Sequence, residues 1–158
     1  MHNSTTLLAA THGRGMWTIA IREPAVTTLG PGCAGTVGVP LLTATPPRLG
    51  TTVTLTCNNL RPGHFALFLV GLSNTSWAGI PLPLDLGVLG MPGCTGYTSG
   101  DFITAIVNVG GAAQTTVGLS SNPSGLGFTF YSQVLAQDPG INAFGAVTSN
   151  ALALTVGN

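Results

Sequence analysis

Side chains that could carry out acid–base or metal chemistry are few in this sequence. His12 lies in a predicted turn and His64 at the start of a predicted strand, and no G-x-S-x-G segment supplies a serine nucleophile. Asp85 (in PLPLD) and Asp138 (in QDPG) are typical of turns, although two carboxylates meeting in space could form a glycosidase pair or a calcium site. The remaining candidates are His2, Glu23 and Asp101. We predict no catalytic residue and a protein that is not an enzyme.

The three cysteines, Cys33, Cys57 and Cys94, are the other reactive groups. They allow three single disulfide pairings, and no C-x-x-C or H-x-x-x-H spacing suggests a metal site. The glycines do not form a strand–GxGxxG–helix unit that would hold a phosphate group. We therefore expect no metal and no cofactor.

Charge is scarce throughout the chain. Charged residues make up 5% of the sequence, lysine is absent, and the formal net charge is zero. A protein of this kind lacks the basic surface that nucleic acids and anionic membranes require, and little repulsion opposes its self-association. The longest apolar run, residues 65–72, is far shorter than the roughly 20 residues of a membrane-spanning helix. We expect no nucleic-acid partner and no membrane span.

The elements available to position these residues are short strands. The 23 glycines and 11 prolines divide the chain into short apolar or alternating segments, and no segment shows a sustained helical period. In the segment 51–57, Val53, Leu55 and Cys57 alternate with threonines, which predicts a half-buried antiparallel strand. Gly110-Gly111 predicts a hairpin turn between two strands. The other predicted strands are 39–45, 64–73, 84–86, 101–108, 112–119, 128–137 and 146–156.

This pattern predicts an all-β fold: an immunoglobulin-like or jelly-roll β-sandwich of 7–8 antiparallel strands with an N-terminal β arm. Residues 1–24 form the predicted arm, because residues 5–21 comprise two short strands around the turn HGRG. Residues 25–38 are a Gly/Pro-rich linker that leads into the domain, and residues 39–158 are the sandwich.

Two stretches resemble known families. The segment ATHGRGMW resembles the closing strand of sortilin-like or sialidase-like β-propellers. The segments GPGCAG, VPLLTATPPRLG, FLVGLSNTSWAGIPLPLDLGVLGMPGC and FYSQVLAQDPGINAFGAVTSNALALTVG, spread over residues 30–158, resemble a C-terminal β-sandwich domain of large secreted bacterial proteins. This second resemblance implies a domain attached to exported modules, and it implies no enzymatic activity.

In that second family the cysteines of the GC and PGC motifs recur, and here they are Cys33 and Cys94. Both lie in Gly/Pro-rich loops, whereas Cys57 lies on the apolar face of a predicted strand. We therefore expect a Cys33–Cys94 disulfide, which would suit an extracellular or cell-surface protein. No signal peptide follows Met1, so we expect a mature or fragmentary extracellular chain.

The arm carries the main functional prediction. An isolated pair of apolar strands is not stable alone, so it must pack on its own sandwich, belong to an upstream propeller, or add to the sheet edge of a neighbouring molecule. The last mode predicts a noncatalytic structural protein that self-associates, as a homo-oligomer or a fibre. The assembly strand would use Leu7, Leu8, Trp17, Ile19 and Ile21.

The alternative prediction is an accessory module of a larger secreted enzyme that binds carbohydrate or another surface. Trp77 lies in a loop where a sugar ring could stack on it, whereas Phe128 and Phe130 are better explained by core packing. Tyr97 and Tyr131 are further aromatic candidates. Asn3 and Asn74 match the N-glycosylation pattern, so attached or bound glycans are also expected partners.

Overall fold

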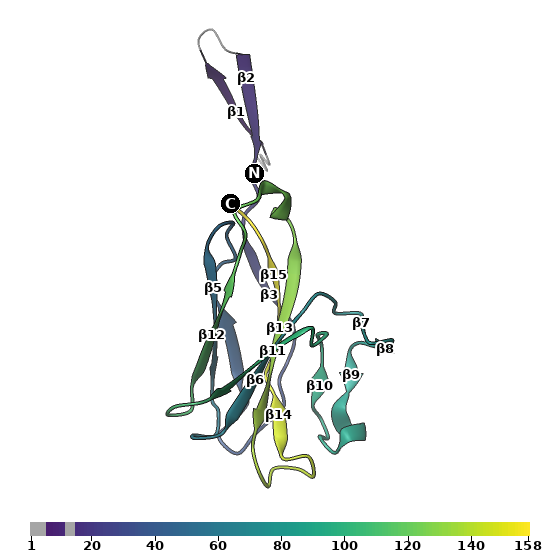
Figure 1. Ribbon diagram of the computed structural model, residues 1–158. Helices are drawn as coiled ribbons and strands as arrows, with labels where there is room; N and C mark the ends of the chain where they lie inside the picture. Colours follow the sequence, from purple (N-terminus) through teal and green to yellow (C-terminus); the bar gives the residue numbers. More distant parts are fainter. Residues whose placement is uncertain (1–5, 12–14) are drawn as a thin grey trace.

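The computed structural model describes residues 6–11 and 15–158, and most of its regular structure is β-strand (Figure 1). The longer strands are β1 (Thr6–Thr11), β2 (Gly15–Ala20), β3 (Ala25–Gly30), β4 (Leu41–Ala44), β5 (Thr52–Asn58), β6 (Phe65–Gly71), β11 (Phe102–Val107), β12 (Ala113–Gly118), β13 (Thr129–Gln137), β14 (Ala146–Thr148) and β15 (Ala151–Thr155). The short elements are β7 (Ser76–Trp77), β8 (Ile80–Pro81), β9 (Leu84–Asp85), β10 (Thr95–Gly96) and the 3-10 helices η1 (Leu86–Leu89) and η2 (Pro123–Gly125). No helix in the described part of the chain is long and apolar enough to cross a membrane.

Two antiparallel sheets form the body of the protein. The large sheet has the order β11-β6-β13-β15-β3, with β14 paired to β13, and the small sheet has the order β12-β5-β4. In the small sheet β5 lies between β4 and β12, and in the large sheet β6 pairs with β13, so both sheets join strands that are not consecutive in the chain. This is the immunoglobulin-like Greek-key connectivity, so the predicted all-β sandwich is confirmed.

The core lies between the two sheets, as the alternating pattern of β5 predicted. Val53, Leu55 and Cys57 have no exposed surface, whereas the threonines between them are half-buried on the outer face. Phe68 on β6 and Val134 on β13 face these residues from the large sheet and are also fully buried. The two-residue period of a strand sends every second side chain inward, which makes this face readable from sequence.

The predicted linker, residues 25–38, is corrected by the structure. Its first part, Ala25–Gly30, is strand β3, which pairs antiparallel with β15 at one edge of the large sheet. The segment before it also belongs to the body. Arg22 N donates a hydrogen bond to Asn158 Oδ1, and Asn158 N donates one to Arg22 O. The sandwich therefore begins near Arg22, and only the hairpin of β1 and β2 stands apart from it.

The predicted hairpin at Gly110-Gly111 is also corrected. The turn exists, with Val109 bridged to Ala112, but β11 continues into the large sheet and β12 into the small sheet. The turn is therefore a corner between the sheets. As a result, two edge strands lie on the same side of the sandwich.

The predicted strand 146–156 is interrupted at Ser149 and Asn150. The Ser149 hydroxyl accepts a hydrogen bond from Val134 N, and the buried Asn150 side chain bonds both N and O of Leu42 in the opposite sheet. These side chains replace the backbone hydrogen bonds that a continuous strand would form at 149–150. The segment is therefore divided into β14 and β15.

A long insertion between β6 and β11 forms a side lobe, residues 72–100. Figure 1 shows it beside the sandwich, containing β7 to β10 and η1. Asp85 caps η1 by accepting a hydrogen bond from Gly87 N at 2.8 Å. The lobe is anchored to the large sheet by Gln133, whose amide bonds Tyr97 N and Thr95 O.

Candidate functional site

The two edge strands on one side of the sandwich, β11 and β12, border an open groove of about 380 Å³. We call it the edge groove. Every residue of its lining is either apolar or a threonine. The lining residues are Val70, Leu72, Phe102, Thr104, Thr115, Thr116, Val117, Gly118, Leu119, Phe128 and Phe130. The groove exists because the corner at 110–111 sends consecutive strands to different sheets, leaving no strand to close the gap between their edges.

The edge groove exposes side chains that point toward the core. The β11–β6 register places Phe102 opposite Val70 and Thr104 opposite Phe68. Residues opposite each other in an antiparallel pair lie on the same face of the sheet, so Phe102 and Thr104 share the inner face with Phe68. Phe68 is 1% exposed, whereas Phe102 is 64% exposed. The groove therefore exposes inward-facing side chains at the edge of the core, whereas Phe68 and Phe130 stay buried.

The rim of the groove corrects the prediction that Phe128 packs in the core with Phe130. Phe130 is buried, but Phe128 precedes β13 and is 51% exposed. Its backbone pairs with Val156 and its side chain borders the groove. Sequence reasoning also missed Phe102 and Thr104; the uncharged strand FITAIV was their only signal.

Strand β11 lacks the features that commonly protect an edge from pairing with another chain. Its sequence FITAIV contains no charge, proline or glycine. Asp101, which precedes it, is occupied: its carboxylate accepts hydrogen bonds from Leu72 N and the Ser99 hydroxyl, both at 2.7 Å. The bond from Leu72 N and then that from Ser99 lower the pKa of Asp101. The edge is thus open to main-chain hydrogen bonding.

The predicted assembly strands form the β1–β2 hairpin, a separate two-stranded sheet. Its register pairs Leu7 with Ile19, Leu8 with Thr18 and Ala9 with Trp17. Ile21 lies just after β2 and is half-buried. In Figure 1 the hairpin extends beyond the end of the sandwich at which the C-terminus lies. Each of its strands has six residues, as do β11 and β12.

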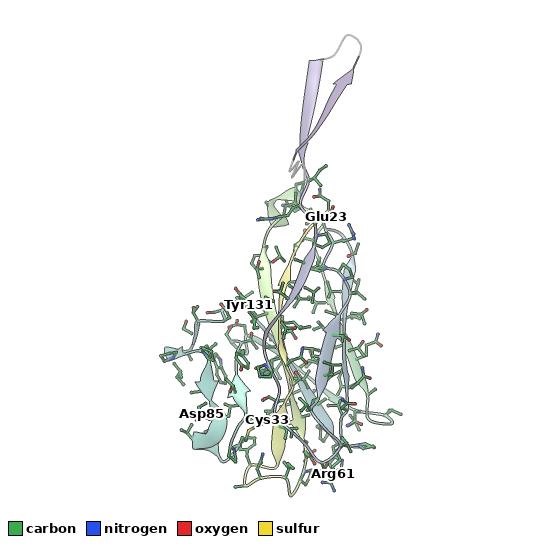
Figure 2. The ribbon with its side chains drawn as sticks, turned by 180° about the vertical axis from the view of Figure 1, so that it is seen from behind. Glu23, Cys33, Arg61, Asp85 and Tyr131 are labelled. Carbon is green, nitrogen blue, oxygen red and sulfur yellow. A yellow bond between two sulfur atoms is a disulfide. The ribbon has the colours of Figure 1, made fainter. Side chains whose placement is uncertain are left out.

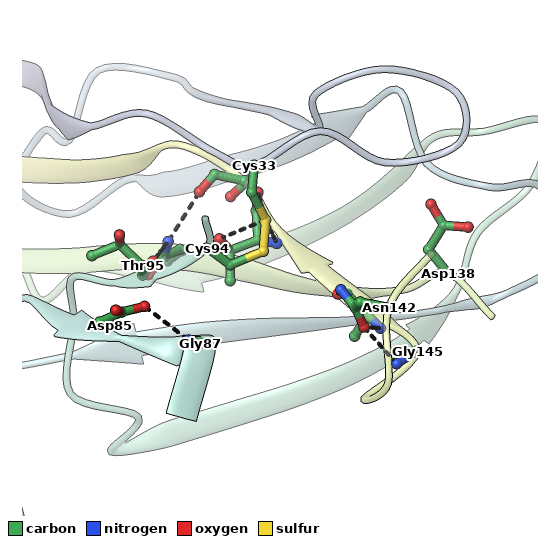
Figure 3. Close-up of a disulfide and its surroundings, with 12 residues drawn as sticks. Cys33, Asp85, Gly87, Cys94, Thr95, Asp138, Asn142 and Gly145 are labelled. Atoms are coloured by element: carbon green, nitrogen blue, oxygen red, sulfur yellow. Dashed lines mark hydrogen bonds between the residues drawn. A yellow bond between two sulfur atoms is a disulfide. The ribbon is translucent and has the colours of Figure 1, made fainter. Parts of the chain in front are cut away.

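The predicted disulfide joins Cys33 to Cys94, with the Cα atoms 4.9 Å apart (Figure 3). It connects the segment between β3 and β4 to the end of the side lobe. Cys57 is the free cysteine among the described residues; it is buried, and this burial raises its pKa from 9.0 to about 12. Its thiol is therefore protonated and shielded at neutral pH.

The charged residues labelled in Figure 2 lie in different parts of the molecule. Glu23 is near the base of the hairpin, Asp85 lies in the side lobe, and Arg61 is at the opposite end of the sandwich. Asp138 is 3% exposed at its side chain and forms an ion pair with Arg61 at 3.4 Å. It also accepts hydrogen bonds from N and Oγ1 of Thr36, so it holds the 35–38 loop against the turn that follows β13.

The remaining candidate residues do not converge on one site. His64 Nδ1 contacts Pro62 O at 2.9 Å, and among the described residues no group of three His, Cys, Asp or Glu side chains could hold a metal. Trp77 is 43% exposed in the lobe, whereas Tyr97 and Tyr131 are half-buried. Asn74 is half-buried in a loop. Asn3, His2 and His12 lie outside the described residues.

Comparison of the chain with protein-family models, curated proteins and solved structures finds no match. The two resemblances drawn from sequence therefore stay predictions.

Proposed function

We propose that this chain is a noncatalytic, extracellular structural protein that self-associates by strand addition. The β1–β2 hairpin of one copy would pair with the β11 edge of the next copy. The observation that carries this proposal is the edge groove, where an unprotected strand edge lies beside exposed apolar side chains of the inner face. Main-chain hydrogen bonds would supply affinity, and apolar side chains of the hairpin would cover Phe102 and its neighbours.

The location of donor and acceptor determines the kind of assembly. The hairpin leaves one end of the sandwich, whereas the edge groove lies along its side. Because the two surfaces differ, the contact is heterologous, and repeated addition produces a filament unless the rotation between copies closes a ring. Residues 6–11 and 15–20 match β11 in length, so one hairpin strand could pair along the whole edge.

Charge and redox chemistry are consistent with this role. The net charge of zero does not oppose close packing of identical chains. A disulfide with both cysteines buried is typical of proteins exposed to an oxidising environment, which supports an extracellular or cell-surface location.

The first test removes the donor. Deleting residues 1–20 leaves the bonds between Arg22 and Asn158 intact, so the sandwich should still fold. We expect the full chain to sediment as concentration-dependent oligomers and the truncated chain as a monomer. Equal sedimentation of the two chains, whether both are monomeric or both oligomeric, would rule out assembly through the hairpin.

The second test blocks the acceptor. Thr104→Lys places a charge in the edge groove, whereas Gln114→Lys adds the same charge at an exposed position of β12 that is not part of the groove lining. We expect Thr104→Lys to reduce the association constant at least tenfold and Gln114→Lys to leave it within twofold. Equal effects of the two lysines would place the contact elsewhere.

The alternative, an accessory carbohydrate-binding module, is supported by the exposure of Trp77 on β7. An indole exposed in this way can stack on a sugar ring. Binding to a glycan panel that is lost in Trp77→Ala, together with a monomeric full-length chain, would favour this function over assembly.

A further inference from the structure

A second cavity lies on the outer face of the large sheet, beneath the side lobe, and it is distinct from the edge groove. Its volume is about 240 Å³. Leu67 and Leu69 of β6 and Leu135 of β13 form one wall, and Leu82, Leu84, Leu86, Leu89 and Met91 of the lobe form the opposite wall. We call it the lobe cavity. An engineered cavity of about 150 Å³ lined by apolar side chains stays dry and binds benzene, so this one has room for a larger apolar group.

The lobe cavity presents no unsatisfied polar group. The polar side chains in its wall are Gln133, Thr98 and Thr148. The Gln133 amide bonds Tyr97 N, Thr95 O and Ser149 O, and the Thr98 hydroxyl bonds Ser99 O. Thr148 Oγ1 lies 3.5 Å from Cys33 Sγ. No charged residue lines the cavity. Sugars, peptides and ions would lose hydration there without gaining a partner.

The cavity opens to solvent through apolar side chains. Ile103, Leu89, Phe144 and Trp77 belong to its lining and are 57%, 53%, 52% and 43% exposed. A neighbouring hollow of about 360 Å³ on the same face shares Leu67, Leu135 and Phe144 with it. The apolar surface therefore continues from the cavity along the sheet, which suits an elongated ligand.

The lobe is fixed to the sandwich by covalent and hydrogen bonds, which sets the position of the cavity walls. The Cys33–Cys94 disulfide ties the end of the lobe to the body, Leu86 N donates to Cys94 O, and Gln133 anchors the segment 95–97. A lobe attached in this way cannot collapse freely onto the sheet. The site is pre-formed, as small-molecule sites usually are.

We propose that the lobe cavity binds the uncharged hydrocarbon chain of a lipid-like molecule. The hydrocarbon chain of the ligand enters past Trp77 and Ile103, and its continuation lies along the adjacent hollow near Phe144. A free long-chain alcohol and an acyl chain of a neutral membrane lipid share this chemistry. This inference does not depend on self-association, because the edge groove uses the inner face of β11 (Phe102 and Thr104), whereas Ile103 belongs to its outer face.

Two glycines allow the cavity to be filled without removing any side chain. A Cβ on Gly100 would lie 3.7–3.8 Å from Trp77, Ile103 and Leu69, and a Cβ on Gly96 would lie 3.7 Å from Leu86. Neither glycine has a left-handed backbone and an added Cβ meets only ordinary contacts, so Gly100→Val and Gly96→Val place side-chain volume in the cavity. Ala25→Val is the control, since Ala25 is exposed on β3 and lines neither the edge groove nor the lobe cavity.

The test is fluorescence titration of the full chain with N-phenyl-1-naphthylamine, followed by displacement with 1-decanol. We expect saturable binding of one probe per chain and displacement by 1-decanol but not by maltohexaose. Either valine variant in the cavity should weaken binding at least tenfold, while Ala25→Val stays within twofold. Thermal melts identify any variant that does not fold. If one of the two cavity variants is unfolded, the probe affinity of the other one tests the proposal.

Vesicles of phosphatidylcholine distinguish the two sources of the hydrocarbon ligand. If the wild-type protein co-sediments with the vesicles and Gly100→Val does not, the ligand is an acyl chain of a membrane lipid. Displacement by 1-decanol without co-sedimentation indicates a free ligand. Absence of saturable probe binding, or undiminished binding by folded cavity variants, overturns the proposal. Self-association measured on Gly100→Val should be unchanged, so failure here is separate from failure of the proposed assembly.

Discussion

Reduction of the Cys33–Cys94 disulfide should destabilise the protein by about 4 kcal/mol. The cysteines are 61 residues apart, and closing a loop of that length removes roughly 14 cal/mol/K of entropy from the unfolded chain in the chain-entropy model. At 25 °C this entropy corresponds to about 4 kcal/mol. For a chain of this size each kcal/mol lowers Tm by about 2–4 °C, so we expect a decrease of roughly 8–16 °C.

The measurement is equilibrium unfolding in urea of the wild-type chain with and without reductant. Comparing one sequence in two redox states avoids the packing changes that a substitution would add. Unfolding at about pH 5 keeps the Cys57 thiol protonated after it becomes exposed, so it does not exchange with the disulfide. A loss of less than 1 kcal/mol would refute the reasoning, since it would mean that the unfolded chain gains little freedom when the loop opens.

The other predictions concern three buried or hydrogen-bonded polar groups. Burial raises the pKa of Cys57 from 9.0 to about 12. The free energy of unfolding should therefore be unaffected by this thiol below about pH 9 and should fall as pH rises from there toward 12. Cys57→Ala should flatten that part of the curve of unfolding free energy against pH, and an unchanged curve would contradict the assignment. The lowered pKa of Asp101 should stabilise the fold above its ordinary value of 3.8, with the contribution lost as pH falls through the folded-state pKa, and Asp101→Asn should reduce the acid sensitivity measured by urea unfolding. Gln133→Leu leaves Tyr97 N, Thr95 O and Ser149 O without this partner and should cost about 3 kcal/mol in the same assay; a cost below 1 kcal/mol would show that the lobe is held by other contacts.

Local sequence pattern predicted those parts of the molecule that short-range physics controls. The alternation in residues 51–57 identified the buried face of β5, because a strand points alternate side chains to opposite sides. Asp85 was correctly interpreted as a turn residue, since its side chain acts within a few residues. The difference in environment between Cys33 or Cys94 and Cys57 also predicted the disulfide that forms.

Tertiary structure decided which strands are neighbours. The segment 25–30 lacks a strong strand pattern, and it is a strand because β15 offers it a pairing edge. Gly110-Gly111 is compatible with either a hairpin or a corner, and burial on the two sheets selects the corner. The exposure of Phe102 follows from that choice and could not be read from FITAIV alone.

Local patterns in the sequence therefore specified most of the strands, the inward face of β5, the disulfide and the scarcity of charge. The packing of the sheets determined where inward-facing side chains are exposed and where the side lobe leaves a cavity. The cause is the range of the interactions: alternation and turn chemistry act over a few residues, whereas the edge groove and the lobe cavity join segments far apart in the sequence, such as the strands that place Leu69 opposite Gln133. Such contacts depend on how whole sheets pack, and no local pattern encodes them.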